Sequence, residues 1–125
     1  MSLLSGLLGN ASTIDPARAS LEYGRVLANG EVILLAFQLI RDVFMFSDKR
    51  LILIDRQGLT GSKVEYNSVP YRSITRFSVE TAGTFDLDAE LKIWMSGQPQ
   101  PIQKRFNKQV DVYQVQSLLA SLVVR

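Results

Sequence analysis

The sequence contains no cysteine and no histidine among its 125 residues. The absence of cysteine excludes disulfide bonds, a thiolate nucleophile and thiolate ligands for zinc. The absence of histidine removes the side chain that titrates nearest neutral pH and that most often binds catalytic metals. The composition still allows enzymes whose catalytic groups are carboxylates, lysine, tyrosine or serine. However, the sequence places no pair of such groups for general acid–base catalysis. We therefore expect a non-enzymatic protein without a cofactor or metal.

An excess of charge of one sign and long hydrophobic runs are also missing. Fourteen Lys and Arg stand against twelve Asp and Glu, and the signs alternate along the chain, whereas nucleic-acid-binding proteins cluster their basic residues. We therefore expect no nucleic-acid partner. The longest apolar runs, Val32–Phe37 and Val43–Phe46, are far shorter than the roughly 20 residues of a membrane-spanning helix. The leucine-rich start has no basic region and no cleavage site, so it does not resemble a signal peptide, and we expect a cytoplasmic location.

Residues 1–29 are predicted to form a helical extension that precedes a single domain. Asp15 can cap a helix that starts at Pro16, and this helix runs to about Val26 before Gly30 ends it. A short leucine stripe comes before this helix and is too short to be stable alone, so it must dock on its own domain, a neighbouring subunit or a membrane surface. Its members are Leu3, Leu4, Leu7 and Leu8.

From residue 30 onward the apolar periodicity changes from that of a helix to that of a strand. Phe77 and Val79 alternate with polar residues, and Leu91 and Ile93 do the same. Turn residues separate the apolar segments from one another. Seven strands are predicted: Glu31–Ile40, Val43–Phe46, Leu51–Ile54, Lys63–Val69, Ile74–Thr81, Asp88–Met95 and Ile102–Phe106.

The C-terminal segment is predicted to be an amphipathic helix. Asp111 followed by Gln114 matches a capping box, and the apolar face comprises Val112, Val115, Leu119 and Leu122. Seven short antiparallel strands can close into a barrel or two orthogonal sheets, and a terminal helix can fill the open end. The sequence therefore predicts a mainly β, pleckstrin-homology-like barrel over residues 30–125, capped by the C-terminal helix.

Several motifs in this region resemble the bacterial pleckstrin-homology domain family. They are Arg41-Asp42-x-Phe44-x-Phe46-Ser47-x-Lys49-Arg50-Leu51-Ile52, Asp55-x-Gln57-Gly58-x-x-Gly61-x-Lys63, Tyr66-x-Ser68-Val69-Pro70-Tyr71-x-x-Ile74 and Asp111-Val112-Tyr113-x-Val115-Gln116. The resemblance covers about Glu31 to the C-terminus. It implies a small stand-alone bacterial barrel that assembles into closed homo-oligomeric rings and has no catalytic residues.

Eukaryotic relatives of this fold often bind phosphoinositides through a basic pattern across the first two strands and their loop. The first loop of this sequence carries only Arg41, beside Asp42, and the next basic pair, Lys49 and Arg50, follows the second strand. A multiply phosphorylated headgroup needs several convergent cations. The sequence therefore lacks the basic pattern through which these relatives bind phosphoinositides.

The first two strands are apolar on both faces, although a small barrel buries only one face of each strand. The second face is covered either by other copies of the chain or by the N-terminal helices. Our leading hypothesis is a homo-oligomeric scaffold that presents a repeated surface to a protein partner. The outward Trp94 is either a subunit contact or a half-buried surface residue. The candidate interface comprises Leu3, Leu4, Leu7, Leu8, Ile33, Leu35, Phe37, Phe44, Phe46 and Trp94.

The alternative function is a peripheral membrane module that binds anionic lipid at the inner face of the membrane. The leucine stripe would then act as an insertion wedge. The densest basic cluster is Lys104–Lys108, and scattered solubilising charges are the competing interpretation. The candidate residues for an anionic ligand or partner are Lys49, Arg50, Lys104, Arg105 and Lys108.

Two further patterns have a simple structural explanation. Gly58 and Gly61 have the spacing of a phosphate-clamping loop, but they lie between strands, which favours a hairpin that needs positive φ angles. Asp86, Asp88 and Glu90 share one face of a strand and could hold Ca²⁺ or Mg²⁺, but no further ligand supports a metal site. We expect these carboxylates to keep an edge strand soluble.

Overall fold

The computed structural model describes residues 11–59, 61–81 and 89–124. Within these residues the chain forms eight strands, two α-helices and two short 3₁₀ helices. In order they are β1 (Ser12–Ile14), α2 (Pro16–Glu22), η1 (Gly24–Val26), β2 (Ile33–Gln38), β3 (Val43–Ser47), β4 (Arg50–Gln57), β5 (Lys63–Pro70), η2 (Tyr71–Ser73), β6 (Ile74–Glu80), β7 (Ala89–Met95), β8 (Ile102–Phe106) and α3 (Val112–Val123).

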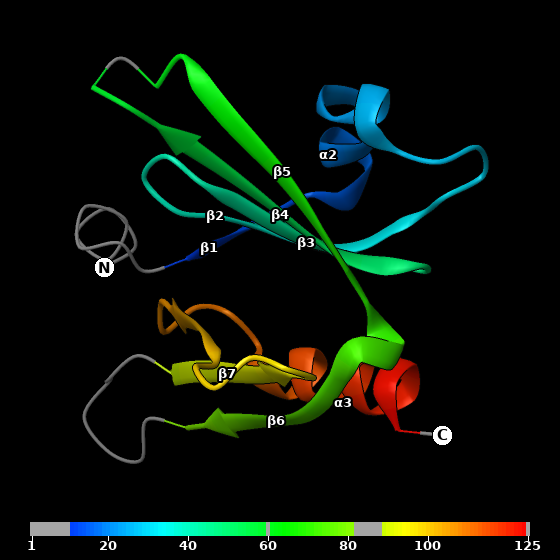
Figure 1. Ribbon diagram of the computed structural model, residues 1–125, viewed down its shortest axis with the longest axis vertical. Coiled ribbons are helices and arrows are strands. Elements are labelled where there is room, and N and C mark those ends of the chain that lie inside the picture. Colours follow the sequence, from blue (N-terminus) through cyan, green and yellow to red (C-terminus); the bar gives the residue numbers. More distant parts are fainter. Residues whose placement is uncertain (1–10, 60, 82–88, 125) are drawn as a thin grey trace.

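The strands form two antiparallel sheets. Strands β1 to β5 make one sheet in sequence order, and β6 to β8 make the other. The sheets lie one above the other, with α3 at one end and α2 on the outer side of the five-stranded sheet (Figure 1). The expected mainly β architecture with a C-terminal helix is confirmed.

The start of β1 joins the two sheets to each other. Ala11 forms a parallel bridge with Phe106 at the end of β8. The Ala11 N–H donates to the Arg105 carbonyl oxygen at 2.6 Å, and the Asn107 N–H donates to the Ala11 carbonyl oxygen at 2.9 Å. These bonds satisfy backbone groups that an open sheet edge would leave exposed, so they close this side of the barrel.

Residues 12–14 are a strand, which corrects the prediction that residues 1–29 are helical. Thr13 pairs with Phe37, and Ile14 pairs with Ala36, so β1 extends the sheet beyond β2. Two β-branched residues in three favour an extended backbone here, whereas the helix signal begins only at Pro16. This strand is the eighth, in addition to the seven predicted.

Helix α2 is shorter than predicted and lacks the expected side-chain cap. Pro16 occupies the first turn as expected, but the Asp15 side chain forms no capping hydrogen bond. The helix ends at Glu22, and the next residues tighten into η1, which begins at Gly24. Gly24 ends the α-helix because glycine has a high conformational cost inside it.

The two apolar faces of β2 and β3 belong to two different hydrophobic clusters. One face lies between the sheets and contributes Phe37 and Phe44 to the main core. The other face contributes Ile33, Ala36, Val43 and Met45 to a second cluster, where they pack with the fully buried Ala19 of α2. The chain therefore covers its own doubly apolar strands, which was one of the two alternatives left open by the sequence.

Helix α3 closes one end of the barrel. The Asp111 side chain accepts hydrogen bonds from the Tyr113 and Gln114 N–H groups, which confirms the predicted cap. The buried residues Val112, Val115 and Leu119 lie on one face and belong to the main core. None of the described helices is long and apolar enough to cross a membrane.

Candidate functional site

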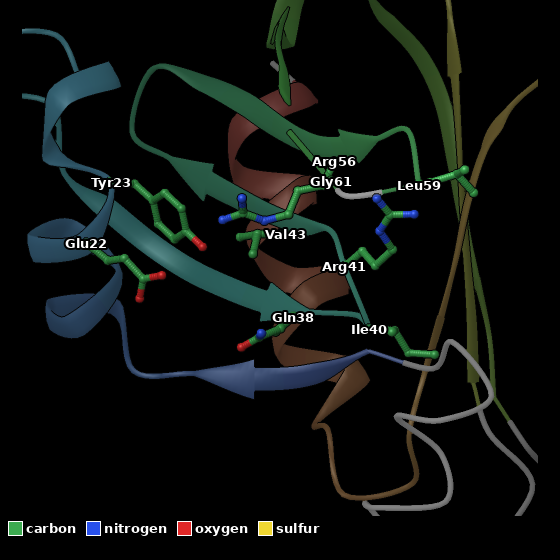
Figure 2. A pocket seen from close by; sticks show the side chains of 9 residues that line it. All are labelled: Glu22, Tyr23, Gln38, Ile40, Arg41, Val43, Arg56, Leu59 and Gly61. Atoms are coloured by element: carbon green, nitrogen blue, oxygen red, sulfur yellow. The ribbon is translucent and has the colours of Figure 1, made fainter. Parts of the chain in front are cut away.

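An open pocket lies between the end of α2 and two loops of the five-stranded sheet. It has a volume of about 410 Å³, and we refer to it as the α2 pocket (Figure 2). The loops are the β2–β3 turn and the β4–β5 turn. The pocket is lined by Glu22, Tyr23, Gln38, Ile40, Arg41, Val43, Arg56, Leu59 and Gly61.

Two arginines bring positive charge to this pocket, Arg41 from the β2–β3 turn and Arg56 from β4. The Leu39 N–H donates to the Asp42 carbonyl oxygen at 2.8 Å and closes the β2–β3 turn around Arg41, which therefore lies beyond the β3–β4 ladder and its last pair, Val43 with Ile54. The Asp42 side chain accepts a hydrogen bond from the Arg56 backbone N–H at 2.9 Å, which fixes this part of the strand pair. Neither arginine forms an ion pair with a carboxylate of the described residues.

The glycines of the β4–β5 turn fit around Arg41. Its Nη2 donates to the Gly58 carbonyl oxygen at 2.6 Å, and a Cβ at Gly61 would lie 3.1 Å from this nitrogen. Gly58 and Gly61 have φ angles of 83° and 69°, so the expected hairpin with positive φ is confirmed. The turn therefore holds one face of the Arg41 guanidinium.

Tyr23 forms the side of the pocket nearest α2. Its hydroxyl is directed toward the Arg56 guanidinium, and Glu22 lies beside it (Figure 2). Burial raises the pKa of Tyr23, and the hydrogen bond and charge of Glu22 raise it further, while Arg56 acts in the opposite direction. The Tyr23 hydroxyl is thus a neutral group between a carboxylate and a guanidinium.

Arg50, a predicted anion-binding residue, is instead part of a network that holds the N-terminal segment on the barrel. Its Nη2 lies 2.9 Å from Glu31 Oε1 and 2.6 Å from the Val26 carbonyl oxygen, and its Nε lies 3.0 Å from Glu31 Oε2. The Ser47 hydroxyl and the Ala28 N–H also donate to the fully buried Glu31 carboxylate.

The hydrogen bonds to Arg50 have a large electrostatic effect on Glu31. Together with the Ser47 and Ala28 hydrogen bonds and the charge of Arg50, they lower the Glu31 pKa from its ordinary value of 4.5 to about 2, against the opposing effect of burial. The same contact raises the pKa of Arg50. The Arg50 side chain is only 24% exposed and is occupied by these partners, so it offers little to an external ligand.

Five of the six predicted interface residues that the structure describes are buried inside the chain. The main core contains Leu35, Phe37, Phe44 and Phe46, and the second cluster contains Ile33. Phe37 stacks on Phe44 with ring centroids 5.1 Å apart. Contacts within one chain therefore account for these five residues. The sixth described candidate, Trp94, is half-buried. The Arg76 guanidinium lies 4.3 Å from the centroid of its ring. Leu3, Leu4, Leu7 and Leu8 lie outside the described residues.

The other predicted basic residues have separate surroundings. The Lys104 Nζ lies 5.5 Å from the ring centroid of Phe44, whereas the exposed Arg105 points to the opposite face of β8, 3.9 Å from Glu90. Lys108 is exposed. Lys49 lines a second pocket of about 450 Å³, together with Asp48, Pro70, Tyr71, Arg72, Leu122 and Val123.

Sequence reasoning noted Arg41 but missed Arg56. No local pattern pointed to Arg56, because it joins Arg41 and Tyr23 in one pocket only after α2 and the β2–β3 turn have packed beside β4. Of the three carboxylates considered for a metal, Asp86 and Asp88 lie outside the described residues. Glu90 is close to Lys92 and Arg105, at 4.0 Å and 3.9 Å.

Comparisons with known proteins agree on one family. The family model of the bacterial PH domain matches residues 2–123. The Bacillus subtilis protein YjqA, which is uncharacterised, is 53% identical over 123 residues that make up 98% of each chain.

Two solved structures have the same fold. A DUF1696 family protein with a pleckstrin-homology domain from Shewanella loihica has a TM-score of 0.83 and 50% identity, over 93% of this chain and 99% of that one. A pleckstrin homology domain from Shewanella amazonensis has a TM-score of 0.72 and 47% identity, over 98% and 99% of the two chains. The predicted family resemblance and the pleckstrin-homology-like fold are confirmed.

Proposed function

Because the chain belongs to the bacterial PH domain family, we propose that it is a non-enzymatic interaction module that assembles with further copies of itself through the edge of β5. The observation that carries this proposal is the position of β5 at the end of the five-stranded sheet. No other described strand pairs with its outer edge. An unpaired edge presents N–H and C=O groups that another strand can bind.

The sequence of β5 supports pairing with another strand rather than protection from it. Natural edges are commonly blocked by proline, bulges, short length or charged side chains, and the two charges of β5, Lys63 and Glu65, have opposite sign. Strand β5 has eight residues in unbroken register with β4, and its proline, Pro70, stands at the very end. Tyr66 adds an aromatic side chain that is 54% exposed on this strand. Aromatic residues are enriched in interfaces between proteins.

The charges on β5 favour a second copy as the partner. Lys63 and Glu65 flank Val64. If two copies of β5 pair in antiparallel fashion about a two-fold axis at Val64, each Lys63 lies opposite Glu65 of the other copy. Within one chain Glu65 lies opposite Asp55, and like charges in this position are destabilising. Lys63 of the second copy would reduce this repulsion.

Self-assembly is tested by measuring absolute mass with light scattering after size exclusion. We expect a mass of about 28 kDa, twice the 14.0 kDa of one chain, or a higher multiple if a second contact extends the assembly into a ring. A mass of 14.0 kDa at 100 µM protein would refute the proposal.

The role of β5 is tested by reversing its charges. We expect Lys63→Glu and Glu65→Lys each to weaken assembly, and the double exchange K63E/E65K to restore it, because the exchange recreates the opposite-charge pairs. The control is Arg18→Glu on the exposed side of α2, which should leave the mass unchanged. An assembly that is insensitive to both single reversals would show that β5 is not the interface.

A further inference from the structure

We propose that the second pocket, which lies between the β3–β4 turn, η2 and the end of α3, binds a carboxylate carried on an aliphatic group. We refer to it as the α3 pocket, and its volume of about 450 Å³ is within the usual range for small-molecule sites. Lys49 and Arg72 would bind the carboxylate, and Leu122 and Val123 would pack against the aliphatic group. These four side chains lie outside β5, so the inference does not depend on self-assembly.

The α3 pocket and the α2 pocket lie at opposite ends of the five-stranded sheet. Because neighbouring strands are antiparallel, the β3–β4 turn lies at the end of the sheet away from the β2–β3 and β4–β5 turns. Helix η2 lies beside α3 (Figure 1). The site is therefore built by the end of the barrel that α3 closes.

The Tyr71 side chain fixes the two segments that carry the cations. Its hydroxyl oxygen lies 2.6 Å from the Ser47 carbonyl oxygen and 2.9 Å from the Arg50 carbonyl oxygen, on either side of the β3–β4 turn. Tyr71 is only 5% exposed, and burial raises its pKa, so the hydroxyl stays protonated and remains a donor. Lys49 lies within this turn and Arg72 directly follows Tyr71, so both side chains start from anchored backbone.

The two cations have no partner in the part of the chain that the structure describes. Neither the Lys49 ammonium nor the Arg72 guanidinium forms a hydrogen bond or an ion pair there, and both residues are exposed. A planar guanidinium can bind both oxygens of a carboxylate, and the ammonium adds a second positive charge. The pocket therefore offers donors to an anion, whereas the neighbouring Arg50 is already occupied by Glu31.

The charge of the pocket favours an anion with a single negative charge. Lys49 and Arg72 stand against one carboxylate, Asp48, which leaves one net positive charge among the lining residues. Asp48 is held in place because it accepts a hydrogen bond from the Val32 N–H at 2.9 Å. The C-terminal end of α3 adds partial negative charge. Both would repel a phosphate dianion, whereas one carboxylate balances the net charge of the pocket.

The remaining lining residues are suited to an aliphatic group. Leu122 and Val123 line the pocket from α3, Pro70 lines it from the end of β5, and all three are partly buried. Both α3 residues pack against the main core, which fixes their positions. An alkyl group in the pocket would remove their exposed apolar surface from water, and this favours binding.

Two sources of such a carboxylate fit the pocket. One is a free aliphatic acid. The other is the C-terminal residue of a polypeptide that ends in leucine, isoleucine or valine, because this residue places an aliphatic side chain next to a carboxylate. The pocket is open to solvent on one side, so the rest of such a polypeptide can leave it.

Binding is tested by two-dimensional NMR, following the amide signals of Lys49, Arg72 and Val123 during titration with isocaproate. We expect saturable shifts. Acetate lacks the aliphatic group and should bind at least about tenfold more weakly. Isocaproamide lacks the charge and should bind at least about fivefold more weakly. Equal binding of all three compounds would refute a site that recognises both parts of the ligand.

The role of the cations is tested by the double substitution K49Q/R72Q. We expect it to raise the dissociation constant for isocaproate at least about fivefold. The matched control is R18Q/R25Q, which removes two exposed positive charges from α2 and η1, outside the pocket, and should change the constant less than about twofold. Equal effects of the two double substitutions would overturn the proposal. The amide spectra also report whether each variant is folded.

A purely structural role of the cations gives a different result. Positive charge near the C-terminal end of a helix stabilises it, so K49Q/R72Q could act through α3 alone. A lower melting temperature of K49Q/R72Q with unchanged affinity for isocaproate would assign the cations to this role and overturn the proposal. Val123→Thr keeps the shape of the side chain and makes it more polar, so we expect about threefold weaker binding of isocaproate.

The source is identified with the acetylated peptide Gly-Gly-Gly-Leu. A peptide that binds at least about fivefold more tightly than isocaproate, and loses this binding when its C-terminus is amidated, would identify a polypeptide C-terminus. Equal or weaker binding of the peptide would identify a free acid. The proposal is overturned if neither isocaproate nor the peptide gives a saturable shift below about 10 mM.

Discussion

Replacing Glu31 by glutamine should destabilise the protein strongly at neutral pH. Glu31 is fully buried at its carboxylate and accepts hydrogen bonds from Ala28, Ser47 and Arg50. Its pKa of about 2, against an ordinary value of 4.5, corresponds to about 3 kcal/mol in favour of the ionised folded form. The substitution also leaves the half-buried Arg50 without its counter-ion. We expect the free energy of unfolding to fall by about 2–4 kcal/mol at pH 7.

The stability that Glu31→Gln removes should be largest at neutral pH and smaller in acid. Because the Glu31 pKa is lower in the folded protein, its stabilising contribution is complete above about pH 4.5 and decreases as the pH falls toward 2. Glu31→Gln has no such group. The difference in stability between wild type and variant should therefore narrow below pH 4.5.

Urea unfolding followed by circular dichroism at pH 7 and at pH 3 measures both effects. Glu90→Gln is the control, because Glu90 lies on the outer face of β7 at 3.9–4.0 Å from its cationic neighbours, and exposed pairs contribute less than about 1 kcal/mol. The reasoning is refuted if Glu31→Gln stays within about 0.5 kcal/mol of wild type at pH 7. It is also refuted if the difference between the two proteins is the same at pH 7 and pH 3.

Three further substitutions test other parts of the fold by the same unfolding assay. Tyr71→Phe should cost about 1 kcal/mol, because the Tyr71 hydroxyl donates to the Ser47 carbonyl oxygen at 2.6 Å, and a spectroscopic titration should find the Tyr71 pKa raised by burial. Gly58→Ala should cost about 1 kcal/mol because of its φ of 83°, whereas Gly24→Ala, with open space around it, should not destabilise. Leu119→Ala should cost about 2–5 kcal/mol, since this fully buried side chain fills the end of the barrel, and a cost below 1 kcal/mol would contradict the capping role of α3.

The regular elements were predictable because their signals are local. The alternation around Phe77 and Leu91 and the spacing of Val112, Val115 and Leu119 each reflect one buried face, and the structure places these residues in one core. Capping by Asp111 was predictable for the same reason, because the donor groups lie two and three residues away. Strand β1 was missed because three residues carry too little periodicity, and its formation depends on pairing with β2.

The contacts of the polar residues could not be predicted from local sequence patterns. Arg50 was identified as a surface cation, but Glu31 lies 19 positions away and meets it only after the sheet has formed. Likewise, the second apolar face of β2 and β3 would look the same in the sequence whether α2 or another subunit covers it, because both bury similar side chains. The pocket that Arg41 and Arg56 line depends on the positions of α2 and the β2–β3 turn, which periodicity alone does not give.

The bridge between Ala11 and Phe106 has a consequence for the order in which the chain folds during synthesis. Neighbouring strands from β2 to β5 can pair as soon as each leaves the ribosome, since each contacts the segment made just before it. Ala11 directly precedes β1, yet its partners Arg105 and Phe106 lie in β8, which follows the other seven strands in the sequence. A nascent chain must therefore keep this side of its first sheet open until β8 has been translated. Any premature stop before Ile102 would release a polypeptide whose barrel cannot close there, and such a fragment would be prone to aggregate.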